Sequence, residues 1–153
     1  MSVDKVRTHL SKWNRDRDVV ELEVSTATVE LAAEALKVVA GRIAKSLSFR
    51  SGQSALLIVV AGDKRVDNRK FKQQFGFSPR MLNPEEVLAF TGFAVGGVCP
   101  FGLPDAFPVY LDESLRQFDS VFPACGSSNS MIEVSLAELE EYSGSQGWVE
   151  VSK

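Results

Sequence analysis

A run of seven apolar residues, Ala55–Ala61, is the feature that most constrains the fold of this chain. A run of this length suits a strand better than a helix, and a strand that is apolar on both faces belongs in the centre of a covered sheet. The preceding segment, Ile43–Phe49, alternates, and Lys45 falls among the large apolar side chains of one face. This alternation predicts a second strand, which is half-buried.

Helix signals flank these strands. Apolar spacing and recognisable helix starts predict helices at Met1–Trp13, Val29–Val38, Asp67–Phe75, Pro84–Phe90 and Leu136–Tyr142. Thr28 and Asn83 are expected to cap two of them, and Ser135 begins a capping box with Glu138. Gly41 is expected to end the second helix, because glycine often follows the last turn.

Short strands are expected at Val19–Val24, Pro108–Leu111, Ser120–Phe122, Met131–Val134 and Trp148–Val151. Strands and helices alternate, and no internal repeat or linker is visible. The chain has 153 residues, of which 44% are hydrophobic and 24% charged, values that are typical of one globular domain. We therefore expect a single α/β domain over residues 1–153, of mixed α+β character, with a mixed sheet curled into a barrel-like shape and surrounded by helices.

The sequence gives no sign of export or of membrane insertion. No apolar run approaches the ~20 residues of a membrane span, and Met1–Arg7 lacks the apolar region of a secretory signal. Cys99 and Cys125 are the only thiols, and two cysteines in such a chain favour reduced thiols over a disulfide. We therefore expect a cytoplasmic protein without a membrane partner.

Two classes of enzyme site are excluded by the residue inventory. His9 is the only imidazole, and the chain contains neither C-x-x-C nor H-E-x-x-H. A zinc site needs three or four protein ligands, and a serine or cysteine triad would need His9 as its base. An enzyme with this sequence is therefore expected to work without histidine, metal or any other cofactor. Cys99 has no partner base and is expected to pack rather than to act as a nucleophile.

The charges of the chain are segregated although the net charge is only −3. Residues 37–80 hold ten basic and two acidic groups, whereas residues 81–153 hold eleven acidic and two basic groups. A basic middle segment suits the phosphate backbone of a nucleic acid. Alternatively, the middle segment is a solvated surface whose charges pair with the acidic last third of the chain.

The segment Val95–Gly102 is rich in glycine and matches neither a dinucleotide fingerprint nor a P-loop. Paired glycines before a proline allow backbone N–H groups to point into a cavity. Such donors can hold a developing oxyanion, and the loss of one typically costs ~3–4 kcal/mol. The other interpretation of the segment is an ordinary tight turn.

Lys45 is the second unusual feature, because it shares a strand face with Ile43, Leu47 and Phe49. A lysine on an apolar face is costly unless its ammonium meets an anion or another acceptor. Two explanations stay open: Lys45 lines a ligand cavity, or its side chain reaches past the strand end into water.

A series of short motifs follows in order along residues 25–142. The motifs are Leu31–Leu36, Arg42–Leu47, Ala61–Asp63, Val66–Asp67, Pro84–Val87, Gly96–Gly102, Tyr110–Leu115 and Gly126 with Ser135–Leu139. Together they resemble the YbaK/ProX family of aminoacyl-tRNA deacylases, which is related to the editing domain of bacterial prolyl-tRNA synthetase. Lys45 together with the G-x-x-x-P loop Gly96–Pro100 is the most specific part of the resemblance.

The resemblance implies the family fold, a barrel-like mixed sheet surrounded by helices. It also implies hydrolysis of the ester that joins a wrong amino acid to the terminal adenosine of a tRNA. In related enzymes no side chain is the nucleophile, a hydroxyl of the terminal ribose helps to activate water, and loop amides hold the substrate carbonyl. Carried over, Lys45 orients the terminal nucleotide, and Gly96 and Gly97 supply the backbone donors.

The resemblance further implies six substrate-binding residues, namely Thr28, Ser46, Val98, Cys99, Pro100 and Ser128. Thr28 falls where relatives place a pocket wall, and Ser46 where some relatives carry a discriminating polar side chain. Because Thr28, Ser46 and the Gly96–Cys99 loop hold no large side chain, esters of alanine, cysteine, serine or threonine are expected. The expected partner is a mischarged tRNA, with a synthetase such as prolyl-tRNA synthetase as a second candidate, for a freestanding monomer or homodimer.

Two positions depart from the family pattern. The segment Phe122–Ser130 holds no acid or imidazole where some relatives carry histidine or aspartate, so their amino-acid preference does not transfer. Lys37 stands where a helix glycine is often found, which we interpret as a surface change of small consequence. A second hypothesis also stays open, a non-catalytic module of the same fold that binds tRNA or a synthetase. The presence of Lys45 and of Gly96–Pro100 favours the enzyme.

Overall fold

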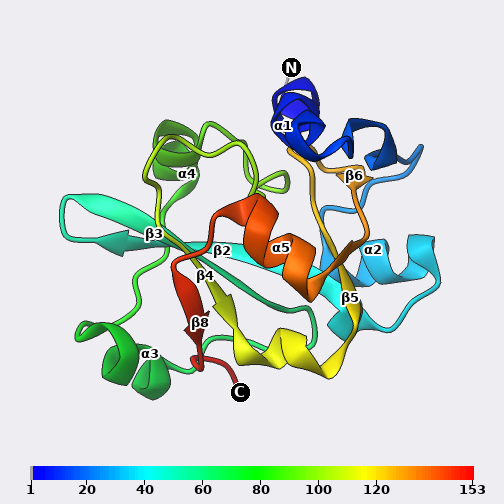
Figure 1. The fold of residues 1–153 in the computed structure, drawn as a ribbon. Helices are drawn as coiled ribbons and strands as arrows, with labels where there is room; N and C mark the ends of the chain where they lie inside the picture. The colour runs from blue at the N-terminus through cyan, green and yellow to red at the C-terminus, as the bar shows by residue number, and fades with distance from the viewer. Residues whose placement is uncertain (1) are drawn as a thin grey trace.

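A hairpin of two long strands forms the centre of the computed structural model, which describes residues 2–153 (Figure 1). β2 (Ile43–Ser51) and β3 (Ser54–Ala61) pair antiparallel, with Ala44 opposite Ala61 and Ser51 opposite Ser54. The residues from Leu57 to Ala61 have 0% exposed surface. The expected buried central strand is therefore confirmed.

Four shorter strands extend this hairpin into a six-stranded mixed sheet with the order β7-β5-β2-β3-β4-β8. β5 is parallel to β2, β4 to β3 and β8 to β4, whereas β7 is antiparallel to β5. The bounds are β4 (Val109–Asp112), β5 (Ser120–Pro123), β7 (Val134–Ser135) and β8 (Gly147–Val149). The curled mixed sheet with helices around it confirms the expected α/β fold with a barrel-like sheet.

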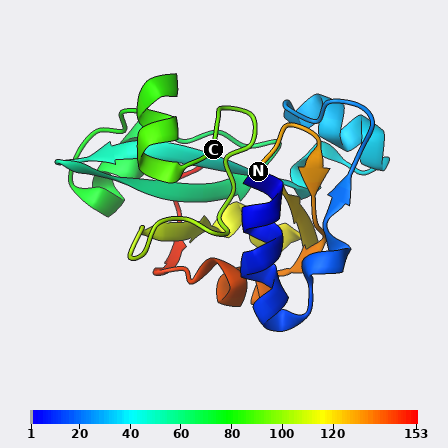
Figure 2. The ribbon, with the colours of Figure 1, turned by 90° about the horizontal axis from the view of Figure 1, so that it is seen from above.

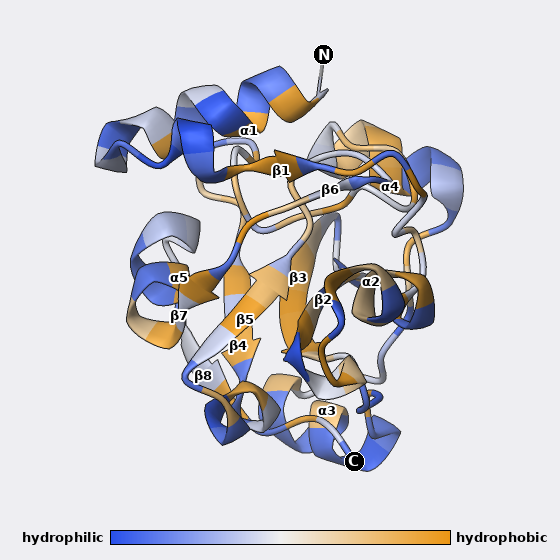
Figure 3. Ribbon diagram, turned by 90° about the vertical axis from the view of Figure 1, so that its right-hand side faces the viewer, coloured by the Kyte–Doolittle hydropathy of each residue, from blue (hydrophilic) through white to orange (hydrophobic). Residues whose placement is uncertain are grey.

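Helices cover both faces of the sheet (Figure 3), as expected when β3 packs into an apolar core on each of its faces. Leu57 and Val59 pack into the larger core, to which α1 (Ser2–Leu10) and α5 (Leu136–Ser143) contribute. Ile58 and Val60 pack on the other face against Phe71 of α3 (Asn68–Phe75). Among the described residues, no helix is long and apolar enough to span a membrane.

The expected helix caps are present. Thr28 begins α2 (Val29–Leu36), and its hydroxyl accepts a hydrogen bond from the N–H of Leu31. Asn83 begins α4 (Pro84–Thr91) in a capping box with Glu86, and Ser135 forms a capping box in the same way at the start of α5. These caps satisfy N–H groups that a helix start leaves without a partner.

Two predicted helix ends are wrong. α1 ends at Leu10 and is followed by a 3₁₀ turn, Ser11–Trp13, rather than running on to residue 13. α2 ends at Leu36, where Lys37 takes the left-handed conformation (φ 57°) in which glycine is favoured. Gly41 is instead buried in a 3₁₀ turn, and a Cβ there would lie 2.8 Å from the ring of Phe118. Gly41 therefore allows a close approach and does not end the helix.

Two predicted strands are also shorter than expected. The segment 19–24 forms only β1 (Val20–Glu21), which pairs with β6 (Ser130–Met131) in a separate two-stranded sheet. The predicted strand at 131–134 is split, because β6 belongs to that small sheet and β7 to the main sheet. Beyond β1, the chain is tied by hydrogen bonds from the N–H of Leu22 to Asn129 O and of Thr26 to Ser128 O.

Candidate functional site

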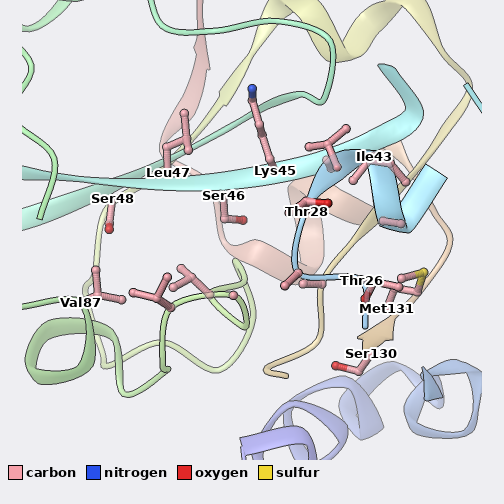
Figure 4. A pocket seen from close by; sticks show the side chains of 18 of the residues that line it. Thr26, Thr28, Ile43, Lys45, Ser46, Leu47, Ser48, Val87, Ser130 and Met131 are labelled. Atoms are coloured by element: carbon pink, nitrogen blue, oxygen red, sulfur yellow. The ribbon is translucent and has the colours of Figure 1, made fainter. Parts of the chain in front are cut away.

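One cavity of about 450 Å³ lies between β2, the start of α2, α4 and the glycine-rich loop (Figure 4). Its walls are mostly apolar, and they include one charged residue, Lys45, and no carboxylate. This composition is typical of a small-molecule site, in which a few polar groups fix the orientation of a ligand. The lining comprises Thr26–Val29, Ala32, Ile43–Ser48, Met81, Leu82, Pro84, Val87, Val95, Gly96, Val98, Phe122, Ala124, Ser130 and Met131.

The start of α2 is held close to β2 by a glycine. Gly62 follows β3, and a Cβ on it would lie 2.3 Å from Ala40 O and 2.7 Å from a methyl group of Val29. Only glycine permits this approach. The contact fixes the first turn of α2 and its capping residue, Thr28, at the cavity wall.

β2 presents its polar residues to two sides. Figure 4 shows Ser46 and Ser48 on the cavity side of the strand, with Lys45 and Leu47 on the opposite side. The hydroxyl oxygen of Ser46 is buried and has no hydrogen-bond partner among the described residues. A buried hydroxyl without a partner costs about 1–3 kcal/mol, which a ligand can recover by bonding to it.

The ammonium of Lys45 lies beside the cavity, on the other side of β2 from Ser46. Burial lowers the pKa of this lysine, and the charges of Glu30 and Asp63 partly offset the shift. No ion pair within 4.0 Å holds the ammonium among residues 2–153. The ammonium is therefore available to a ligand phosphate or hydroxyl.

The two glycines of the loop have different surroundings. Gly96 adopts the left-handed region (φ 95°) and lines the cavity. Gly97 packs behind it, since a Cβ on Gly97 would lie 2.7 Å from Gly126 O. The N–H of Gly97 donates to Ala94 O at 3.0 Å. Among the described residues, the N–H groups of Gly96 and Val98 have no partner, so they are the donors that can meet a ligand.

The segment after β5 contributes a different serine from the one expected. Ser130 lines the cavity, and its hydroxyl bonds to Ser127 at 2.8 Å. Ser128 lies behind Gly96, with its Cβ 3.7 Å from where a Gly96 Cβ would be, and its carbonyl accepts from Thr26. Thus Ser128 supports the wall but does not line it.

Of the residues expected at the site, the structure brings together Thr28, Lys45, Ser46, Gly96 and Val98. Gly97, Cys99, Pro100 and Ser128 lie outside the lining. Thr26, Ser48, Ser130 and Met131 also line the cavity and were not predicted from the sequence. The alternation of β2 could have indicated Ser48, because it shares a face with Ser46.

The thiols and the histidine lie away from the cavity lining. Cys99 has 0% exposed surface, its thiol donates to Phe101 O, and burial raises its pKa to about 12. His9 packs against Trp13 and bonds to Tyr142 O at 2.7 Å, and burial lowers its pKa. Among residues 2–153 there is no group of three or more His, Cys, Asp or Glu side chains arranged to hold a metal.

Comparison with known proteins points to one family. Residues 23–142 match the family model of the aminoacyl-tRNA editing domain. The chain is 57% identical over 154 residues to "Uncharacterized protein YwhH" of Bacillus subtilis (strain 168), covering all of this chain and 98% of that protein. It is 29% identical over 110 residues to "Putative Cys-tRNA(Pro)/Cys-tRNA(Cys) deacylase EbsC" of Enterococcus faecalis, covering 71% of this chain and 67% of that protein.

A solved structure shares the fold over nearly the whole chain. Its description is "Crystal structure of a putative trans-editing enzyme for prolyl tRNA synthetase". The TM-score is 0.89 at 35% sequence identity, and the match covers 99% of this chain and 97% of the other.

Proposed function

Because the chain belongs to the aminoacyl-tRNA editing domain family, we propose that it is a trans-editing deacylase that hydrolyses the ester of a mischarged tRNA in the cytoplasm. The observation that carries the proposal is the arrangement at the cavity. Gly96 and Val98, whose N–H groups have no partner among the described residues, line a cavity that β2 also lines, and Lys45 lies beside it. A carbonyl and an adjoining nucleotide phosphate would each meet a complementary group.

The reaction needs no nucleophile from the protein. A water oxygen attacks the ester carbonyl carbon, and the carbon–oxygen bond to the terminal ribose breaks. The proton released by water passes to the leaving ribose oxygen, with help from the neighbouring ribose hydroxyl. In this scheme the N–H groups of Gly96 and Val98 stabilise the oxyanion, and such a donor typically contributes ~3–4 kcal/mol.

In this scheme Lys45 acts outside the amino-acid subsite. Its ammonium and the Ser46 hydroxyl lie on opposite sides of β2, so one strand separates two subsites. The amino acid would occupy the Ser46 side, and the terminal nucleotide the Lys45 side. By binding the terminal nucleotide on its side of β2, Lys45 orients the ester toward the loop amides, which is a positioning role.

The cavity favours a small, neutral amino acid. Its walls hold uncommitted hydroxyls at Ser46 and Ser48, and no carboxylate to balance a cationic side chain. Side chains from Val87, Phe122 and Met131 narrow the remaining space. Esters of serine, threonine, alanine and cysteine are the proposed substrates, because one methylene changes binding by only ~1–3 kcal/mol and such a cavity rejects by size.

Replacing Thr28 by phenylalanine is expected to shrink the set of accepted amino acids. The added ring would enter the cavity from the start of α2, so threonyl esters should be lost before alanyl esters. Thr28→Ala is the matched control, since both variants lose the helix cap, at about 1 kcal/mol of stability, but only one adds bulk. Single-turnover deacylation of four mischarged tRNAs measures the profile. An unchanged profile in Thr28→Phe would remove residue 28 from the amino-acid subsite.

Cys99→Ser and His9→Ala are expected to keep deacylase rates within a few fold of the original protein, and chelators are expected to have no effect. Neither side chain lines the cavity, and the Cys99 thiol stays protonated because burial raises its pKa to about 12. The metal content of the purified protein is measured alongside the rates. Stoichiometric zinc together with loss of activity on chelation would contradict a metal-free reaction.

The competing function is a module that binds tRNA without cleaving the ester. The fate of a labelled ester distinguishes this module from a deacylase. A deacylase releases free amino acid faster than the uncatalysed rate, at substoichiometric protein. A module that only binds leaves the ester at its uncatalysed rate or protects it. A tRNA that lacks the 2′-hydroxyl of the terminal adenosine should bind but be cleaved far more slowly, because the reaction scheme uses the ribose hydroxyl.

A further inference from the structure

We propose that the exposed face of α3 and the turn before it form the docking surface for the acceptor stem of the tRNA. This inference rests on the proposed function, because the ester lies at the end of that stem. The surface, called here the α3 basic surface, consists of Lys64, Arg65, Arg69 and Lys72. Arg65, Arg69 and Lys72 are exposed, and Lys64 is half-buried.

None of the four members of the α3 basic surface has an ion-pair partner among the described residues, a property that they share with Lys12, Arg17, Lys37 and Lys45. Lys70, which lies between its members, pairs with Glu150 at 3.6 Å and donates to Ser152 O. Elsewhere the arginines that pair with carboxylates are Arg7, Arg15, Arg42, Arg50 and Arg116. The acidic last third of the chain therefore neutralises part of the basic middle segment but leaves this surface uncompensated.

Few acidic groups stand near enough to reduce its field. The stretch from residue 68 to residue 80 contains no acidic residue. Asp67 is occupied as the cap of α3, where it accepts from the N–H of Arg69. Glu150 is held by Lys70. Asp63, directly before Lys64 in the chain, partly offsets the lowered pKa of Lys45. A surface of this kind attracts polyanions.

The α3 basic surface lies on the same side of the sheet as Lys45. Phe71 of α3 packs on Phe49 of β2 with ring centroids 5.0 Å apart. Lys45, Leu47 and Phe49 occupy every second position of β2 and therefore lie on one face, and Leu47 packs in the same core as Phe71. The turn that carries Lys64 starts directly after Asp63, whose charge acts on Lys45.

The position of Lys45 determines on which side of the sheet the tRNA leaves the cavity. If the terminal nucleotide is held at Lys45, the duplex that precedes it must leave the cavity along one side of the sheet. On the side of Lys45, the structure offers four cations without ion-pair partners among the described residues, and arginine forks match phosphate oxygens well. Figure 3 shows α3, most of whose residues are hydrophilic, at one end of the sheet. The α3 basic surface is therefore placed to meet the phosphates of the acceptor stem.

The test compares two variants that remove equal charge. Arg65, Arg69 and Lys72 are replaced together by glutamine in the first variant. In the control variant, Lys12, Arg17 and Lys37 are replaced by glutamine; all three are exposed and none has an ion-pair partner among residues 2–153. Affinity for a CCA-ended acceptor-stem hairpin is measured by fluorescence anisotropy at several salt concentrations. Each variant is also given a short substrate, a 3′-aminoacylated CCA trinucleotide.

The α3 variant should bind the hairpin at least tenfold more weakly at low salt, with a slope of log affinity against log salt reduced by about 2, since each phosphate contact contributes ~0.7–0.9. Its rate on the short substrate should match that of the original protein, and the control should keep its slope. An unchanged slope in the α3 variant overturns the inference, and so does an equal loss on the short substrate. If the original protein cleaves no ester, the proposed function fails, and the slopes still decide the docking surface.

Discussion

Lys45→Ala is expected to lower single-turnover deacylation roughly 10- to 150-fold without unfolding the protein. That range corresponds to the loss of one charge-assisted hydrogen bond, about 1.5–3 kcal/mol. The ammonium has no ion-pair partner within 4.0 Å among the described residues, so its removal breaks no structural bridge. Thermal unfolding measured beside the rate checks the fold. Unchanged cleavage by a folded Lys45→Ala variant would remove Lys45 from the site.

The pH dependence of this effect follows from the burial of Lys45, which lowers its pKa. Because the folded pKa lies below the unfolded value, the charged lysine costs stability at neutral pH, and stability recovers as pH rises through that window. Lys45→Met should therefore be at least as stable as the original protein. The rate ratio of the original protein to Lys45→Ala should approach one at alkaline pH, where the ammonium is lost. Any rate advantage of Lys45→Arg over Lys45→Ala should persist at alkaline pH, because arginine keeps its charge there. If the rate ratio of the original protein to Lys45→Ala does not change with pH, the ammonium of Lys45 does not have this positioning role.

Gly97→Ala is expected to lower kcat by about 10²–10³, the effect of displacing one oxyanion donor. A methyl group on Gly97 would lie 2.7 Å from Gly126 O and 2.9 Å from Ser127 N, and backbone atoms cannot move aside as a side chain does. The backbone of Gly126 cannot move away, because it is packed against α1: a Cβ built on Gly126 would lie 2.8 Å from Ser2 O. Figure 2 shows α1 packed beside this loop. The loop must therefore shift toward the cavity, and the N–H of Gly96 moves with it.

Gly144→Ala serves as the control for general destabilisation. Gly144 ends α5 in the left-handed region (φ 63°), and a Cβ there meets nothing within 4 Å. Alanine at this position should cost about 1–2 kcal/mol of stability and leave the rate unchanged. If Gly97→Ala keeps full activity, or if Gly144→Ala loses as much, the loop amides are not the groups that stabilise the transition state.

The fold could be predicted where local patterns determine it. The apolar run of β3 and the alternation of β2 both hold in the structure, and the alternation also separated Lys45 from Ser46 correctly. The expected caps at Thr28, Asn83 and Ser135 are present as well. Each of these features depends on residues a few positions apart, so the sequence alone carries the information.

The site could be predicted less completely, because turns decide which side chains line it. Gly126 takes a left-handed conformation (φ 98°), and the bonds between Ser127 and Ser130 close the next turn. This geometry turns Ser130 toward the cavity and Ser128 away from it. Cys99 is buried in the core, where its thiol donates to Phe101 O. Contacts of this kind do not follow from spacing along the chain.

The most direct test of the account is single-turnover deacylation of a panel of mischarged tRNAs by the purified protein. The panel contains seryl, threonyl, alanyl and cysteinyl esters, with a bulky aromatic ester as the size control. We expect cleavage of at least one small ester well above its uncatalysed rate, and no acceleration for the aromatic ester. Decay of every small ester at its uncatalysed rate would contradict the account, and efficient cleavage of the aromatic ester would contradict its size limit.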